Sequence, residues 1–336
     1  MRFIKANFPA EKSDAVIAAI EKCKPLDWAM DSGYGRFEKA VEITVDKGNG
    51  QELLDELQRV LSSAANWRVV VLPVEATLPR PPEPEKAPDG EKTKTTSLRE
   101  ELYQKVSGDC KLNMDFIVLT ILSAIVAAIG LNYDSVAIVI AAMVIAPLLG
   151  PILAFALATA LGDLSLMKKA TKTGLAGLGV GFGFAMVLGF FMDANLASHE
   201  LLSRTVLGPE VVALALASGA AAALSLSTGI SSALVGVMVA VALLPPSVAS
   251  ALFLGAGETD KAIAAAVLTA LNVVCAVLSA QLVFVWKGVR PRTWYSQKKA
   301  SKAVKINAAI WLGLLLALAA LSYRIAQSGT LEVLAP

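Results

Sequence analysis

Prolines inside apolar stretches are the residues of this sequence with the clearest capacity for chemistry. One stretch holds Pro147 and Pro151, and a second holds Pro245 and Pro246. Within a helix, a proline supplies no N–H and clashes with the carbonyl four residues earlier. In hydrocarbon, each carbonyl without a donor costs several kcal/mol, so such carbonyls must be buried in protein or face a wet cavity. The four prolines therefore predict two broken helices.

We expect the two breaks to face each other near the middle of the bilayer and to line a central site. The carbonyls that lie four residues before each proline would then be free to accept hydrogen bonds from a ligand. The alternative is that each break is a packed kink, satisfied by serine, threonine or water. Including neighbouring polar residues, the candidates for a substrate or ion pathway are Met143, Pro147, Gly150, Pro151, Val241, Ala242, Pro245, Pro246, Ser247 and Asn272.

Other kinds of chemistry lack the residues that they need. No charged residue lies deep within the apolar stretches, and Cys23, Cys110 and Cys275 are too far apart for a zinc motif or a disulfide framework. His199 has no companions for a metal site or a triad. We therefore expect no metal, no cofactor and no enzymatic activity. A permeant species would be coordinated by carbonyls, hydroxyls and amides, or would itself be apolar.

Four glycines alternate with other residues in the third apolar stretch: Gly177, Gly179, Gly181 and Gly183. A nucleotide-binding loop would need an adjoining strand and a lysine, whereas these glycines lie within an apolar run. Their two GxxxG spacings predict close helix packing instead.

The elements that must position these residues are membrane spans. Hydrophobic residues make up 55% of the chain and charged residues only 17%, and a span needs about 20 apolar residues. Seven stretches qualify or nearly qualify, and we predict a membrane all-α bundle over residues 113–327. The seven stretches are 114–131, 135–161, 174–192, 211–225, 230–254, 262–286 and 306–326.

Lysines and arginines predict the orientation of these spans. Lys168, Lys169 and Lys172 follow the second stretch, and a larger basic cluster follows the sixth. Because basic loops stay in the cytoplasm, seven spans with a cytoplasmic N-terminus satisfy the rule. We expect a multi-pass protein of the cytoplasmic membrane, with the lipid bilayer as its main partner. The net charge of +2 is too small and too spread to indicate nucleic acid.

The second and fifth stretches resemble each other. A shift of 98 positions carries Pro147 onto Pro245, the first stretch onto the fourth, and the third onto the sixth. The chain therefore reads as three helices, three more, and one at the end. An odd number of spans per copy reverses the second copy, which predicts an inverted-topology repeat of the kind found in secondary transporters.

Residues 1–78 predict a separate soluble domain. Apolar patterns alternate between strand and helix in the order βαββαβ, which is typical of an α+β ferredoxin-like domain. Residues 79–96 are rich in proline and charge, which indicates a solvated linker. Residues 97–112 predict an amphipathic helix at the membrane surface that leads into the first span.

The segment around the first break also resembles a known family. Asn132-Tyr133-Asp134-Ser135, the run from Ala141 to Pro151, and Gly162-Asp163 are similar to motifs of the prokaryotic membrane family called domain of unknown function 389. Ala242 to Pro246 is similar to its second signature. The resemblance covers roughly residues 97–290. It implies a membrane location and carries over no catalytic residues.

Three functions remain open at this level. The first is a transporter or channel for a small ion or solute, tuned by the cytoplasmic domain. The second is a membrane-anchored sensor or scaffold whose helices serve assembly. An intramembrane enzyme is disfavoured because the spans hold no nucleophile, paired acids or histidine ligands. The small-residue-rich spans also predict a homo-oligomer, and the soluble domain could bind a small molecule or ion.

Overall fold

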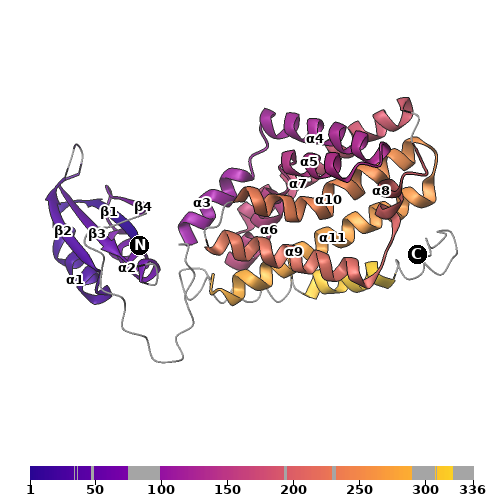
Figure 1. The fold of residues 1–336 in the computed structure, drawn as a ribbon. Helices are drawn as coiled ribbons and strands as arrows, with labels where there is room; N and C mark the ends of the chain where they lie inside the picture. Colours follow the sequence, from indigo (N-terminus) through magenta and orange to yellow (C-terminus); the bar gives the residue numbers. More distant parts are fainter. Residues whose placement is uncertain are drawn as a thin grey trace. The chain divides into compact units, whose positions relative to one another are not determined.

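A computed structural model gives the fold (Figure 1). It describes residues 1–33, 35, 37–46, 49–74, 99–192, 195–228, 232–289, 307 and 309–320, with the backbone alone over 232–242. The chain divides into two compact units, Met1–Arg99 and Glu100–Pro336. The proline-rich segment expected at residues 79–96 lies outside the described residues.

The N-terminal unit is a four-stranded antiparallel sheet with two helices. Its elements are β1 (Arg2–Phe8), the 3-10 turn η1 (Ala10–Lys12), α1 (Ser13–Cys23), β2 (Asp27–Ser32), β3 (Lys39–Val45), α2 (Gly50–Leu61) and β4 (Arg68–Pro73). The strands are ordered β2-β3-β1-β4, so β1 and β3 form the centre of the sheet. Ile4 lies opposite Ile43 on one side and Val71 on the other, which fixes the register.

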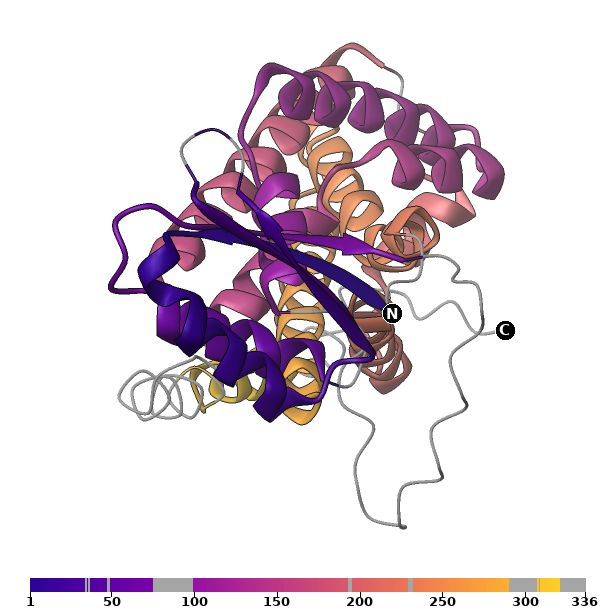
Figure 2. The same cartoon turned by 90° about the vertical axis from the view of Figure 1, so that its left-hand side faces the viewer.

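One face of this sheet holds the core of the unit. Ile4 and Phe8 of β1 and Ile43 of β3 are fully buried with apolar residues of α1 and α2. Because side chains alternate across a strand, Lys5 and Asn7 point to the opposite face, whereas Ala6 is buried in the core with Ile4 and Phe8. Figure 2 shows the sheet crossing in front, with both helices together on one side of it. Apolar periodicity predicted this arrangement, since the same residues repeat at strand and helix spacing.

The second unit is helical. Its elements are α3 (Arg99–Asp109), α4 (Met114–Asn132), α5 (Val136–Ile145), α6 (Leu149–Leu161), α7 (Leu164–Phe191), α8 (His199–Leu202), the 3-10 turn η2 (Ser203–Thr205), α9 (Pro209–Thr228), α10 (Ser232–Gly255) and α11 (Thr259–Trp286). A further apolar helix covers Ala309–Ala320. Helix α11 is the most enclosed of the spans, because 72% of its apolar segment is buried inside the unit.

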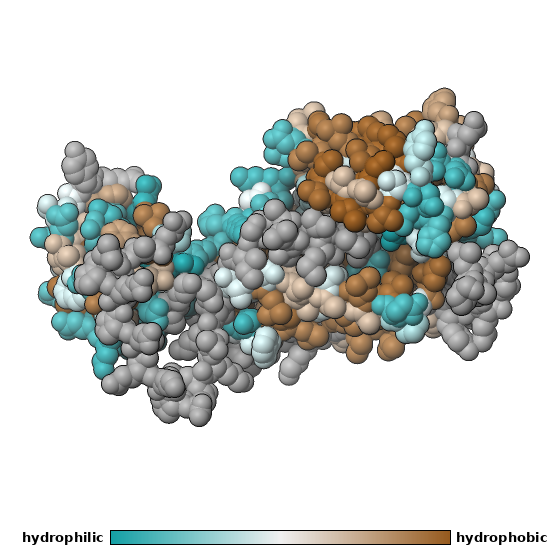
Figure 3. Space-filling view, viewed as in Figure 1, coloured by the Kyte–Doolittle hydropathy of each residue, from teal (hydrophilic) through white to brown (hydrophobic). Residues whose placement is uncertain are grey.

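Among the described residues, four helices are long and apolar enough to cross a membrane: α4, α7, α9 and α11. The bent pair α5 and α6 makes a fifth if it is counted as one span. The seven expected stretches correspond to α4, α5–α6, α7, α9, α10, α11 and the helix Ala309–Ala320, although parts of the fifth and seventh lie outside the described residues. Figure 3 shows a continuous apolar surface over the outer side of α4 and α5. Exposed apolar residues of these two helices include Val118, Leu122, Val136, Ile140 and Val144.

The third expected stretch is longer in the structure than in the sequence analysis. Helix α7 begins at Leu164, ten residues before the expected start at 174, and therefore includes the lysines at 168, 169 and 172. Asp163 caps it, because its carboxylate accepts hydrogen bonds from the N–H groups of Ser165 and Leu166. The apolar pattern located the membrane-type part of the helix, whereas the cap determines where it begins.

Candidate functional site

The helix break expected at Pro147 is present in the structure. Helix α5 ends at Ile145, α6 begins at Leu149, and the two helices are bent by 54°. Ala146 has extended backbone angles of φ −64° and ψ 121°, which stop the helix. Pro147 follows, and because it has no N–H, the carbonyl of Met143 loses its helical donor.

A neighbouring helix donates a hydrogen bond to one backbone carbonyl at the break. The carbonyl of Ala142 accepts one hydrogen bond from the N–H of Ala146 at 3.2 Å and another from the hydroxyl of Ser123 at 2.6 Å. Ser123 belongs to α4 and is fully buried. The alternative of a packed kink supported by serine therefore describes this side of the break.

Pro151 does not break a helix, which corrects the sequence analysis. It is the third residue of α6, whose first residue is Leu149. The first N–H groups of a helix have no intrahelical partner, so a proline at this position removes nothing that the helix uses.

The second expected break is also wrong. Helix α10 continues from Ser232 to Gly255 with Pro245 and Pro246 inside it. Leu243, Leu244 and Ser247 are buried around them. Neighbouring packing therefore holds a helix that the prolines alone would interrupt. The side chains of Val241 and Ala242 lie outside the described residues.

The first break is not at the middle of the bundle. A Cβ built on Gly177 would meet both Leu148 at 3.0 Å and Phe116 at 2.9 Å, and Phe116 lies in the first turn of α4. A Cβ on Gly150 would lie 2.5 Å from the carbonyl oxygen of Asp109, the last residue of α3. The break therefore lies near the end of the unit where α4 begins, against α3.

Only half of the expected glycine packing is present. Gly177 and Gly181 are buried within α7, whereas a Cβ on Gly179 or Gly183 would meet nothing within 4 Å. The reason is helical spacing: residues four apart share a face, and residues two apart do not. One GxxxG pair therefore packs and the other does not.

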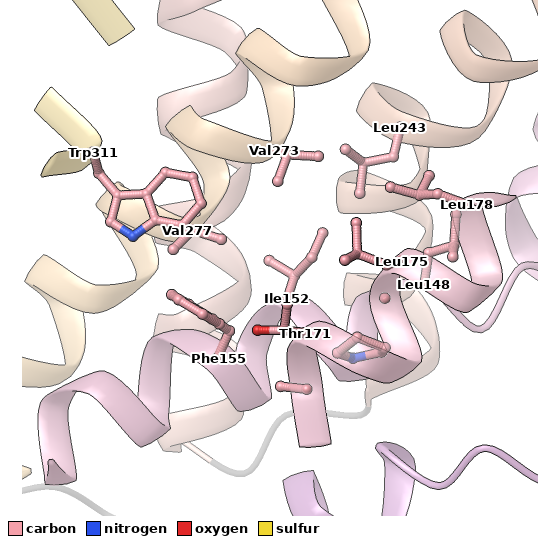
Figure 4. Close-up of a pocket in the computed structure, with 13 residues that line it drawn as sticks. Leu148, Ile152, Phe155, Thr171, Leu175, Leu178, Leu243, Val273, Val277 and Trp311 are labelled. Atoms are coloured by element: carbon pink, nitrogen blue, oxygen red, sulfur yellow. The ribbon is translucent and has the colours of Figure 1, made fainter. Parts of the chain in front are cut away.

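A cavity of about 220 Å³ adjoins the break (Figure 4). Its wall comes from α6, α7, α10, α11 and the helix Ala309–Ala320. The lining residues are Leu148, Pro151, Ile152, Phe155, Ala170, Thr171, Gly174, Leu175, Leu178, Leu243, Val273, Val277 and Trp311. The rings of Phe155 and Trp311 meet edge to face at 5.6 Å. Figure 4 shows the indole at one end and Leu243 and Leu178 at the other.

The cavity takes in only one of the expected pathway residues, Pro151. Ser247 and Asn272 are buried but do not line it. Thr171 supplies the one side-chain hydroxyl of the lining, so the cavity has no ring of oxygens for an ion. In the described part of the chain, no cluster of His, Cys, Asp or Glu could hold a metal.

Two turns of the helical unit have the same pair of residue types, a glycine followed by an acid, as well as the same geometry. Gly288 after α11 shares the geometry, but valine follows it. Gly162 ends α6 with φ 69°, Gly257 follows α10 with φ 82°, and an acidic residue comes next in each case. The N–H groups of Asp163 and Glu258 bond to the carbonyls of Ala158 and Phe253, each at 2.9 Å. All these pairs are 95 residues apart.

Paired helices also repeat with this spacing of 95 residues in their start positions. Helices α7 and α11 both have 28 residues and start 95 positions apart, as do the starts of α4 and α9. This corrects the shift of 98, under which Pro147 matched Pro245. At 95, Pro151 corresponds to Pro246, and Leu148 and Leu178 correspond to the cavity residues Leu243 and Val273. The shared glycine–acid pair was the signal in the sequence that could have found this spacing.

Helix α3 packs along the beginning of α7. Tyr103 donates its hydroxyl to the carboxylate of Asp163 at 3.0 Å, and Lys169 donates to the carbonyl of Ser107 at 2.9 Å. Leu102 and Val106 are buried in the core of the helical unit. The apolar face expected to contact lipid therefore packs on protein.

These contacts change the acidity of both partners. Burial raises the pKa of Tyr103, and the hydrogen bond to Asp163 raises it further. Burial acts to raise the pKa of Asp163 as well, but the hydrogen bonds that it accepts from Ser165, Leu166 and Tyr103 outweigh that effect and lower it. Asp163 therefore holds α3 and the start of α7 together as an ionised group.

The opposite end of the unit is closed by a second carboxylate. Asp134, which has φ 56°, accepts hydrogen bonds from the N–H of Glu200 at 2.6 Å and the hydroxyl of Ser198 at 3.1 Å. The Glu200 bond is the main cause of the lowered pKa of Asp134. Glu200 in turn pairs with Arg204 at 2.8 Å. None of these four residues is among those that line the cavity.

The long apolar helices, together with the antiparallel sheet of the N-terminal unit, define a membrane-embedded protein with an additional small α+β unit. The chain belongs to the family described as domain of unknown function 389, whose pattern matches residues 143–278. An uncharacterized protein of Methanocaldococcus jannaschii is 32% identical over 321 residues, which cover 95% of this chain and 97% of the relative. No solved structure matches the chain. The resemblance in the sequence is confirmed, and the family's description assigns no activity.

Proposed function

We propose that the chain is a membrane transporter with two three-helix repeats of inverted topology, and that its solute binds in the cavity between them. The first repeat is α4, α5–α6 and α7, and the second is α9, α10 and α11. The observation that carries this proposal is the pair of equivalent turns, Gly162-Asp163 and Gly257-Glu258, at opposite ends of α7.

Contacts between glycines support the opposite placement of these turns. Asp163 caps the beginning of α7. A Cβ on Gly255, just before the second turn, would lie 2.8 Å from the backbone of Gly189, near the other end of α7. A helix of 28 residues is about 42 Å long, so the two turns are separated by about the thickness of a membrane. Two equivalent structures on opposite sides are what an inverted repeat requires.

The chemistry of the cavity favours a particular kind of solute. Transporters of this kind bind their substrate at the interface of the repeats, and here both repeats supply equivalent wall residues, Leu148 with Leu243 and Leu178 with Val273. Since the wall is apolar apart from Thr171, the solute that fits has a mainly apolar surface. The alternative of a small inorganic ion loses support, because the described lining offers a single side-chain oxygen, that of Thr171, to replace its water.

The finer topology belongs to the same proposal. Seven spans with a cytoplasmic N-terminus are supported by the 24 helical residues of α10, about 36 Å, and by the apolar helix Ala309–Ala320. A ferredoxin-like fold for residues 1–78 is supported by the βαββαβ order and the sheet order β2-β3-β1-β4. The contacts of α3 with Asp163 and Gly150 offer a route by which this domain could tune transport.

Flux measurements on purified protein in liposomes test the proposal. A panel of apolar and weakly polar solutes should include at least one that crosses faster with the protein than without it. Pro147→Ala restores an N–H at the break and should change that flux. Pro209→Ala is the matched control, because Pro209 is the first residue of α9 and is not among the residues that line the cavity, and it should change the flux little. If no solute moves, the protein is not a transporter, and the sensor or scaffold becomes the better account.

A further inference from the structure

We propose that the solute of this cavity is a single-chain amphiphile with an anionic head, such as a medium-chain carboxylate, which enters from the lipid at the end of the unit where α7 begins. This inference rests on the proposed function for its site, because it names the class of solute that the cavity takes.

The volume favours one alkyl chain. A water molecule occupies about 30 Å³ and a methylene group a similar volume, so a cavity of about 220 Å³ holds roughly seven methylene groups. That is the length of one medium alkyl chain and too little for two acyl chains. The wall offers the chain leucine, valine, isoleucine and two aromatic rings (Figure 4).

The mouth of the cavity is on α7. Leu175 lines the cavity and is 67% exposed, and Thr171 beside it is exposed as well. A ligand can therefore enter sideways from the surrounding lipid. The hydroxyl of Thr171 already donates to the carbonyl of Met167 at 2.9 Å, so it has no hydrogen left for an anionic head, which the neighbouring lysines must bind instead.

Charge at the mouth selects an anion. Lys168 lies three residues before Thr171 and seven before Leu175, so these three residues share one face of α7. Lys172 lies three residues before Leu175. Both lysines are exposed, whereas Lys169 is held by Ser107 on the α3 side of α7. A carboxylate at Thr171 would therefore lie within one helical turn of both lysines.

Two carboxylates near this end, those of Asp163 and Asp109, are on the α3 side of α7. Asp163 is occupied by the cap and by Tyr103 of α3. Asp109 belongs to α3, whose neighbours on α7 include Lys169 and Thr173. The face of α7 that carries Lys168, Thr171 and Leu175 therefore has a positive character at the cavity mouth.

Trp311 provides a direct measurement of binding, since its ring is part of the wall. Full-length protein in phosphatidylcholine nanodiscs is titrated with bromine-labelled decanoate, which quenches nearby tryptophan emission. The quenching lost in Trp311→Phe reports the cavity alone. We expect saturable quenching that depends on Trp311, and no such component would overturn the proposal.

Two sets of variants test separately the cavity that holds the alkyl chain and the lysines that bind the carboxylate. Gly174→Leu fills the cavity, and Gly179→Leu is its matched control on the same helix, where a Cβ would meet nothing within 4 Å. Only the first should abolish the signal. The double change Lys168→Gln with Lys172→Gln should weaken decanoate binding roughly fivefold to twentyfold, and should leave binding of bromine-labelled decanol unchanged. Equal effects on both probes would overturn the anionic head.

A competition experiment identifies which kind of molecule supplies the bound alkyl chain. Phosphatidylglycerol added to the nanodiscs should not displace decanoate. Complete displacement that depends on the same lysines would mean that the occupant is a phospholipid chain, and would overturn the proposal. Decanoate binding without flux of any solute of the panel would refute transport while leaving this site intact. Flux of other solutes without decanoate binding would do the reverse.

Discussion

Replacement of Gly150 by alanine tests whether α3 packs directly on the proline break. A Cβ at this position would lie 2.5 Å from the carbonyl oxygen of Asp109, and ordinary contact begins near 3.4 Å. Helix α3 or α6 must therefore move by about 0.9 Å, the difference between these distances. Overpacking of this kind costs about 1–3 kcal/mol, and the better helix propensity of alanine returns up to about 1 kcal/mol.

The net loss should be about 1–2 kcal/mol and should fall on α3. A loss of this size corresponds to a factor of roughly 5–30 in an equilibrium. Hydrogen exchange of the α3 amides, followed by mass spectrometry on the full chain, should therefore become faster by that factor in Gly150→Ala. The amides of α11, which is enclosed in the unit, should change much less, because they make no contact with Asp109.

Gly108→Ala is the matched control, since Gly108 lies within α3 and its Cβ would meet nothing within 4 Å. This variant should slow α3 exchange or leave it unchanged. If both variants behave alike, steric contact with Gly150 does not hold α3, and the route that we propose from the soluble domain to the break is wrong.

Three further predictions concern the repeat, the cap and the glycine face. Gly162→Ala and Gly257→Ala should each cost about 1–2 kcal/mol, because both glycines have positive φ, and thermal unfolding should show similar losses; a large loss at one position alone would contradict their equivalence. The lowered pKa of Asp163 means that its ionised form stabilises the fold above its ordinary value of 3.8, and that this stability is lost as the pH falls through the folded-state pKa. Asp163→Asn should therefore lower the unfolding temperature at neutral pH and reduce its fall in acid, and an unchanged acid profile would count against this role. Gly177→Ala should destabilise the protein by about 1–3 kcal/mol, since its Cβ would meet Phe116 at 2.9 Å, whereas Gly183→Ala should not; equal unfolding temperatures would refute the assignment of the two faces.

Local sequence patterns were sufficient to predict most of the helices and strands. Alternating apolar residues around Ile4 and Ile43 predicted the central strands, and apolar runs predicted α4, α9 and α11 within a few residues. These predictions succeed because burial of one face is decided by the spacing of residues within a single element. The beginning of α7 was missed, since Asp163 acts through a cap and not through hydropathy.

The prolines show where such reasoning fails. Pro147 breaks a span, Pro151 lies in the first turn of a helix, and Pro245 and Pro246 lie within a continuous one. The covalent chemistry of all four is the same, so the residue type could not separate these outcomes. What differs is the position of each proline relative to a helix start and the packing of neighbouring residues such as Ser123.

The sequence by itself determined that this protein has long apolar helices, a separate α+β unit and a resemblance to its family, because hydropathy, periodicity and motifs belong to short stretches of chain. Only the tertiary structure decided that Leu148, Leu178, Leu243 and Val273 meet around one cavity, that the break lies against α3, and that the expected polar residues remain outside the cavity wall. These facts depend on contacts between residues up to 125 positions apart, from Leu148 to Val273, and no local pattern encodes which side chains meet at that separation.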